Sequence, residues 1–214
     1  MTAPDAPVLT GLAPDPRQPD YRLVEVDRGR LASLPAATLA ALPLVVGEPL
    51  EPAVLARLRE LAEREAALGA ARRALARRSY AWVDLRRHLV EQRHPAAFVD
   101  AALERLAARG LIDDRRHAEQ YAALHAARGH GPARLVHDLR LQGVERRTAE
   151  EAVRQAFEQE GLDPAAMARA VAVKRARQLG ALPQPVRRRR LRAFLMRRGF
   201  TGTQVGELVT ELCG

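Results

Sequence analysis

The sequence has 214 residues, of which 47% are apolar and only 4% are aromatic. A chain of this length and apolar content can bury a hydrophobic core, which excludes a wholly disordered protein, and its many alanines, leucines and arginines argue against an all-β fold. The net charge is +9, and Lys174 is the only lysine among 35 basic side chains. Nearly all of the positive charge therefore comes from guanidinium groups, which suit phosphate and carboxylate partners.

The sequence also indicates a compartment. Cys213 is the only cysteine, so the chain has no internal disulfide and no cysteine pair for a metal. The N-terminus lacks a basic segment followed by an apolar one, and no apolar run reaches the length of about 18 residues that a membrane span needs. We therefore expect a cytoplasmic protein that does not enter membranes.

The first quarter of the chain differs from the rest. Residues 1–20 are rich in proline and aspartate, and this composition predicts a disordered tail. Residues 21–26 alternate enough to predict a strand, residues 27–29 supply a turn, and residues 44–46, just before Gly47, predict a second short strand. Residues 21–51 are thus expected to form a small β-like element.

From residue 52 onward the pattern is helical. Pro52, Pro95, Pro132 and Pro164 each precede a run rich in leucine or alanine, and proline is well tolerated at the first position of a helix. Long helices are predicted over residues 52–78, 114–128 and 164–180. Each of these is followed by two shorter periodic segments.

These segments form an internal repeat. When Leu85, Leu135 and Leu191 are aligned, Leu89, Leu139 and Leu195 coincide four residues later, and Arg93, Gly143 and Gly199 follow at the next turn. Each copy consists of a helix, a turn suited to glycine and a second helix with an apolar stripe. We assign the six leucines to the core.

The expected fold is therefore mostly α. Three tandem three-helix modules, over residues 52–112, 113–162 and 163–214, form an elongated array with a short β-containing N-terminal extension. Two helices joined by a glycine turn also give the outline of a helix-turn-helix DNA reader, but any three-helix bundle produces this outline.

Recognisable catalytic chemistry is absent from the sequence. It contains no glycine-rich phosphate loop, and none of its six histidines forms the zinc-binding pair with an intervening glutamate. The adjacent Asp113 and Asp114 point in different directions, so we interpret them as an N-cap and a first-turn acid. We expect no enzyme, no metal and no cofactor.

The charge is unevenly distributed. Residues 163–214 carry 11 basic and 3 acidic side chains, a net charge of +8, whereas residues 1–52 are net negative. A GC-rich coding sequence could explain the preference for arginine over lysine but not this excess, which attracts polyanions or an acidic protein groove. The candidate binding residues are Arg72, Arg73, Arg77, Arg78, Arg86, Arg87, Lys174, Arg175, Arg177, Arg187, Arg188, Arg189, Arg190, Arg192, Arg197 and Arg198. The alternative is a solvated helix surface, because four consecutive arginines spread around a helix and at most two share a face.

One stretch of the sequence resembles a known family. Residues 110–119, with Gly110, Leu111, Ile112, Asp113 and Asp114 at their start, resemble the signature of the RecX family. The resemblance continues over residues 129–132 and through Leu135, Leu139, Gly143 and Val144. His117 stands where that family usually has phenylalanine.

The resemblance covers roughly residues 53–212 and implies a non-catalytic regulator of recombination and the SOS response. Members of the family bind the RecA filament on DNA, inhibit its ATP hydrolysis and strand exchange, and also contact DNA. We accordingly expect a monomer whose partners are the RecA filament and single- or double-stranded DNA, the latter bound weakly and without sequence specificity. The sequence leaves open one alternative, a DNA-binding helical module that acts without RecA. A structural scaffold is a third possibility, but the +8 charge of residues 163–214 argues against it.

Overall fold

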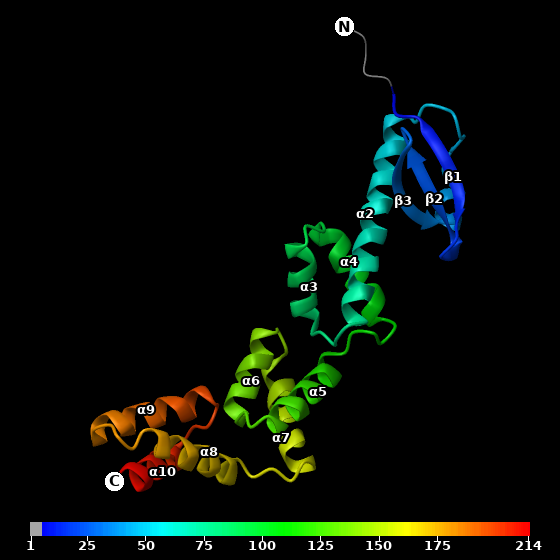
Figure 1. Ribbon diagram of the computed structural model, residues 1–214. Helices are drawn as coiled ribbons and strands as arrows, with labels where there is room; N and C mark the ends of the chain where they lie inside the picture. The colour runs from blue at the N-terminus through cyan, green and yellow to red at the C-terminus, as the bar shows by residue number, and fades with distance from the viewer. Residues whose placement is uncertain (1–5) are drawn as a thin grey trace. The chain divides into compact units, whose positions relative to one another are not determined.

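The computed structural model describes residues 6–214 as two compact units (Figure 1). One unit comprises the residues up to Arg78 together with Leu85–Arg109, and the other comprises Ser79–Asp84 and Gly110–Gly214. The described residues form three strands and ten helices. Their bounds are β1 (Leu9–Asp15), β2 (Gln18–Val26), β3 (Gly29–Pro35), α1 (Ala36–Leu39), α2 (Pro52–Leu75), α3 (Trp82–Glu91), α4 (Ala96–Ala107), α5 (Asp114–Ala127), α6 (Pro132–Leu141), α7 (Arg146–Gln159), α8 (Pro164–Gln178), α9 (Gln184–Arg197) and α10 (Thr203–Cys213).

The three strands form an antiparallel sheet in the order β1-β2-β3 beside α2 (Figure 1). Leu9, Val24 and Leu34, one from each strand, are fully buried in a core that also contains Leu58 of α2. The phenol of Tyr21 donates a hydrogen bond to Glu65 Oε2 over 3.1 Å. These contacts attach the sheet to the first long helix.

The expectation of a disordered tail over residues 1–20 is wrong for the part that the structure describes, because β1 and the start of β2 lie there. Residues 1–5 lie outside the described residues. Proline is compatible with this arrangement because Pro14 lies on the edge strand β1, where a missing N–H is tolerated, and the pairing register shifts next to it. Leu9 supplies the buried anchor that a disordered tail would lack.

The two predicted strands fared differently. The strand over residues 21–26 is confirmed within β2, and residues 27 and 28 form the expected turn. The strand predicted over residues 44–46 is wrong: this segment is irregular, and Val45 and Val46 are more than half exposed. The partner of β2 is β3, which follows directly after the turn.

The long helices agree with their predictions to within three residues at their C-terminal ends. They are α2, α5 and α8, and each is followed by two further helices. Pro52, Pro132 and Pro164 occupy the first helical position, whereas Pro95 is the N-cap of α4. The mostly α class with a β-containing N-terminal extension is thereby confirmed, while the exact module boundaries stay a prediction.

The predicted core is also confirmed. All six repeat leucines are fully buried, and the second and third modules have separate hydrophobic clusters. Gly143 and Gly199 have φ of 89° and 87°, and Arg93 adopts a similar left-handed conformation at 68°. The second helix therefore ends in the same way in all three repeats. The third repeat differs in having a further left-handed residue, Gly202, before its last helix.

The second and third modules, both in the second unit, are joined by backbone contacts. The amide of Gly131 donates to the Arg198 carbonyl over 2.7 Å, and the amide of Ala133 donates to the Gly199 carbonyl over 3.2 Å. A Cβ on Gly199 would lie 2.4 Å from the backbone nitrogen of Arg134. The glycine is thus required both by its positive φ and by this close approach. We call these contacts the Gly131–Gly199 joint.

Candidate nucleic-acid and protein interface

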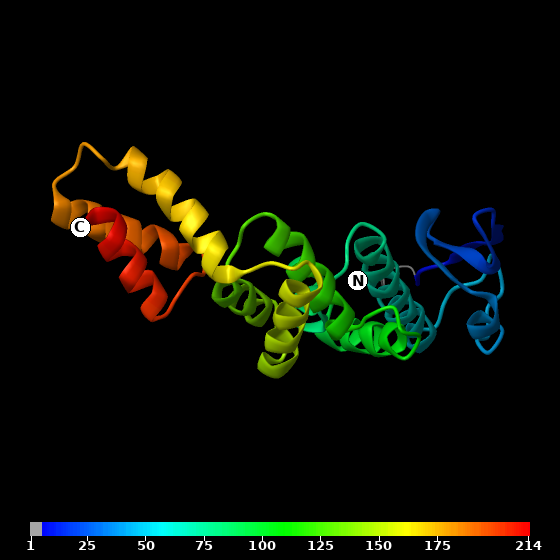
Figure 2. The same cartoon turned by 90° about the horizontal axis from the view of Figure 1, so that it is seen from below.

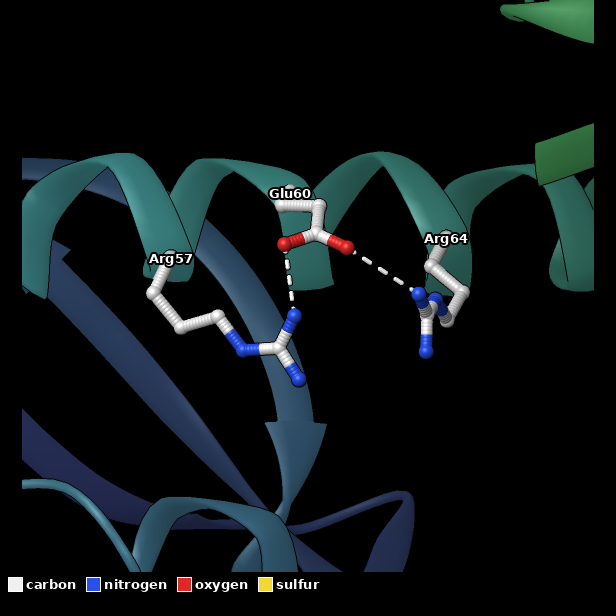
Figure 3. Close-up of polar contacts among 3 residues, drawn as sticks. All are labelled: Arg57, Glu60 and Arg64. Carbon is white, nitrogen blue, oxygen red and sulfur yellow. Dashed lines mark hydrogen bonds and ion pairs between the residues drawn. The ribbon is translucent and has the colours of Figure 1, made fainter. Parts of the chain in front are cut away.

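Several arginines of α2, α5 and α7 have an acidic partner on the same helix. On α2, Glu60 lies between Arg57 and Arg64 and pairs with both (Figure 3). Further pairs separated by four residues are Arg115–Glu119, Arg146–Glu150, Arg147–Glu151 and Arg154–Glu158. Exposed pairs of this kind add little stability, but they neutralise the surfaces on which they lie.

The candidates of the first module fall into two groups. Arg86 donates to both carboxylate oxygens of Asp100, over 2.6 and 3.1 Å, and these hydrogen bonds raise the pKa of Arg86 and lower that of Asp100. Arg86 is therefore engaged within its own module. The remaining candidates, Arg72, Arg73, Arg77, Arg78 and Arg87, are exposed at the end of α2, just after it and on α3.

Three candidates of the third module are engaged in packing. The guanidinium carbons of Arg175 and Arg198 lie 5.5 and 5.4 Å from the ring centroid of Phe194, a cation–π geometry. Arg187 donates from Nη2 to the carbonyl of Cys213 over 3.3 Å, which ties α9 to the end of α10. These three guanidinium groups therefore already make contacts within the third module.

The other third-module candidates are exposed. They are Lys174, Arg177, Arg188, Arg189, Arg190, Arg192 and Arg197. Arg188 donates to the hydroxyl of Thr210 on α10 over 3.1 Å, whereas Arg189, Arg190 and Arg192 have no ion pair with any described residue. The acidic side chains of this module are Asp163, Glu207 and Glu211. Asp163 caps α8, Glu211 pairs with Arg169, and Glu207 and Glu211 line a pocket together with Arg192. The exposed arginines of α9 outnumber these carboxylates, so its surface is predominantly positive.

Sequence reasoning missed Met196, whose side chain is 57% exposed on α9 among these arginines. The repeat pattern gave no signal for it, because Met196 follows the buried Leu195 and looks like an ordinary member of an apolar helix. Only the position of α10 shows that this side chain has no cover.

The acidic pair at the start of α5 does what its spacing predicted, with one addition. Asp113 is the N-cap, and its side chain accepts a hydrogen bond from the amide of Arg116 over 2.9 Å. Asp114 accepts one from the amide of Trp82 over 2.7 Å. The two carboxylates thus serve two different helix starts rather than one reactive centre.

His117 is buried and fully partnered. Its Nδ1 lies 3.0 Å from the hydroxyl oxygen of Ser79, and its Nε2 lies 2.7 Å from Oε1 of Gln142. Because the amide oxygen of Gln142 can only accept, Nε2 donates to it, and the serine hydroxyl can partner Nδ1. This histidine thus has a polar partner at each ring nitrogen.

The described residues contain no group of three or more histidine, cysteine, aspartate or glutamate side chains arranged to hold a metal ion. Across residues 6–214, no helix combines the length and the apolar character needed to cross a membrane.

Tandem three-helix modules, a small N-terminal sheet and an arginine-rich surface on α9 define a helical-repeat protein with a basic third module. Residues 113–153 match the family model of the second three-helix domain of RecX, and residues 163–209 match that of the third. A regulatory protein RecX from Halorhodospira halophila is 40% identical over 143 residues, which cover 66% of this chain and 84% of the relative. One from Pseudomonas savastanoi is 33% identical over 137 residues, which cover 64% and 84%.

Two solved structures share the fold. A crystal structure of regulatory protein RecX aligns with a TM-score of 0.66 at 20% identity, covering 96% of this chain and 99% of the other. The crystal structure of RecX from Lactobacillus salivarius aligns with a TM-score of 0.56 at 17% identity, covering 70% and 96%. Together with the sequence matches, these findings establish that the chain belongs to the RecX family of regulatory proteins.

Proposed function

We propose that this protein binds the RecA filament on DNA and inhibits its ATP hydrolysis and strand exchange. The observation that carries the proposal is membership of the RecX family, in which the matched region includes the second and third modules. The exposed, unpaired arginines of α9 supply a surface suited to DNA phosphates or to acidic groups of a protein filament.

The test is to titrate the full chain into RecA that hydrolyses ATP on single-stranded DNA. We expect inhibition at a small fraction of the RecA concentration, too little to coat the DNA. Inhibition of this kind means that the protein acts on the filament. No inhibition at any ratio would contradict the proposal.

A charge-matched pair of variants tests the surface. The double variant R189A/R190A removes two unpaired arginines of α9, and we expect it to weaken inhibition several-fold with little loss of stability, because surface charges contribute little to folding. The control variant R146A/R147A also removes two arginines, but these are paired with Glu150 and Glu151 on α7. Equal inhibition by both variants would mean that the contact with the filament does not involve these arginines of α9.

The second candidate function is binding to DNA without RecA, which the +8 charge of residues 163–214 favours. Phosphate contacts release counterions, so DNA affinity would fall steeply between a low and a moderate salt concentration. Salt-sensitive DNA binding combined with an unchanged RecA ATPase would favour this alternative.

A further inference from the structure

An open groove runs between α9 and α10 of the third module. These two helices lie next to each other, in orange and red, in both views (Figures 1 and 2). The groove has a volume of about 560 Å³. Its lining residues are Arg188, Arg189, Arg192, Ala193, Met196, Gly206, Val209 and Thr210. We call it the α9/α10 groove.

One side of the groove is strongly positive. Three guanidinium groups line it, and no carboxylate is among its lining residues. Within residues 6–214, Arg189 and Arg192 have no ion pair, and Arg188 reaches across to the hydroxyl of Thr210. Arginines spaced over one turn of a helix can hold several carboxylates at once.

The floor of the groove is apolar and open. Ala193 and Val209 form it, and the exposed Met196 borders it. Gly206 adds no side chain, and a Cβ at that position would already contact a guanidinium nitrogen of Arg192 at 3.6 Å. A methionine in such a place is an adaptable surface for an apolar side chain of a partner.

The combination separates two kinds of ligand. A phosphodiester backbone would use the arginines but would leave the floor unused, since it has no apolar side chain to bury. A peptide helix with carboxylates on one side and leucines on the other would use both, as amphipathic helices do in apolar grooves.

We propose that the α9/α10 groove binds an acidic, amphipathic peptide segment of a protein partner. Its carboxylates pair with Arg189 and Arg192, and an apolar side chain packs against Met196 and Val209. The inference deepens the proposed function by naming the chemistry of the partner segment. It rests on that function only for the identity of the protein that carries the segment.

The experiment measures binding of a labelled synthetic peptide to the full chain by fluorescence anisotropy. The peptide has about 12 residues, mostly glutamate, with two leucines four positions apart so that they share one face of a helix. We expect saturable binding to the wild type. Replacing both leucines with serine should weaken it by about five-fold or more, because apolar anchors carry much of the energy of such contacts.

Two variants and two controls locate the site. M196S and R192A should each weaken binding of the leucine peptide by about five-fold or more. L124S removes a similarly exposed apolar side chain from the second module, and R140A removes an exposed arginine from α6 of that module. Both controls should bind like the wild type, and circular dichroism should show the same helix content in all four variants.

Three outcomes would overturn the inference. The first is equal binding of the serine peptide, which would mean that charge alone is recognised. The second is wild-type peptide binding by M196S. The third is an equal loss of affinity for a single-stranded oligonucleotide: if M196S weakens its binding as much as it weakens binding of the peptide, the groove is a nucleic-acid site.

The same materials separate this inference from the proposed function. A wild-type protein that binds the peptide but leaves the RecA ATPase unchanged supports the groove and overturns the proposed function. A protein that inhibits RecA but does not bind the peptide supports the proposed function and overturns the groove.

Discussion

The histidines of the second module show how strongly a side chain depends on its surroundings. His117 has a partner at each ring nitrogen, whereas Nδ1 of His125 and of His130 is buried and has none among the described residues. The rings of His125 and His130 stack with centroids 5.4 Å apart, and His125 also lies against Tyr121. Protonation of either ring would place a charge in a poorly solvated site.

Both histidines consequently have lowered pKa values. Burial is the main cause for each, followed by Arg128 for His125 and by Arg134 for His130; Arg198 also lowers the pKa of His130. Asp138 acts in the opposite direction on both. The net effect favours the neutral rings in the folded protein.

This shift makes stability depend on pH. The folded pKa values lie below the unfolded value of 6.5, so as the pH falls below that value the unfolded chain takes up protons before the folded one does. We expect the free energy of unfolding, measured by urea denaturation, to be lower at pH 5.5 than at pH 7.5. The carboxylates with lowered pKa values start from 3.8 or 4.5 and affect stability only at lower pH.

The control for this prediction is a pair of variants. H125Q/H130Q should lose less stability than the wild type between the two pH values, while H137Q, at an exposed position, should behave like the wild type. An equal loss in all three proteins would mean that other groups titrate in this range.

At the residue scale, the sequence predicts the role of a residue where the internal repeat or a local rule such as helix capping determines it. The six core leucines follow from the repeat, and the Asp113 cap follows from its position before a helix. The partners of His117 could not be predicted, since Ser79 lies 38 residues away and Gln142 lies 25 residues away. Only the packing of separate elements brings such residues together.

At the element scale, Gly206 is an unfavourable residue for the helix in which it lies. It lies inside α10, where glycine is less favourable than alanine by roughly 0.5–1 kcal/mol. Its φ is not positive, and an added Cβ would make only an ordinary contact with Arg192. No backbone requirement therefore explains the glycine.

The variant G206A should therefore be more stable than the wild type by roughly 0.5–1 kcal/mol, measured by urea denaturation. The substitution also adds a methyl group to the groove wall. A variant that is less stable than the wild type would show that the space above Gly206 is needed for folding.

Helices were easier to predict than strands for a physical reason. Each helix carries its own apolar period, and proline marks several of the starts. The sheet instead depends on an edge strand with proline and on a partner, β3, whose apolar residues are few. Leu44 and its two following valines looked more like a strand than β3 does, yet they remain irregular. The chain pairs with the start of β1 only after them, at an isolated bridge between Val8 and Pro49.

At the scale of the whole molecule, the Gly131–Gly199 joint is the feature that connects modules in the second unit. It could not be predicted, because the repeat identifies Gly199 as a turn residue but does not show that the neighbouring helix α6 approaches its backbone. A glycine with positive φ but open space around it provides the comparison: Gly161 has φ of 61° and no atom within 4 Å of an added Cβ.

We expect G199A to lower the free energy of unfolding by about 2–4 kcal/mol, from backbone strain together with overlap at the joint. G161A should cost about 1 kcal/mol from strain alone. Urea denaturation gives both values. Hydrogen exchange adds a local readout: the amides of Gly131 and Ala133, which donate across the joint, should lose protection in G199A but not in G161A.

Similar costs for the two variants, with unchanged protection at the joint, would show that the close approach at Gly199 is relieved by a small movement.

The joint also limits how such a chain could grow during evolution. Gly143 occupies in the second repeat the position that Gly199 has in the third, and an added Cβ there would meet Val83 of the first repeat. The second module therefore contacts the first through its glycine turn and the third through the region of Gly131. The first repeat has Arg93 at the turn position, and the third has Arg187–Arg190 where the second has Gly131–Arg134. A duplicated middle module could be inserted between the second and the third, whereas a copy added after the third would meet four arginines. The third module thus differs from the second at the very position that receives a neighbouring glycine turn.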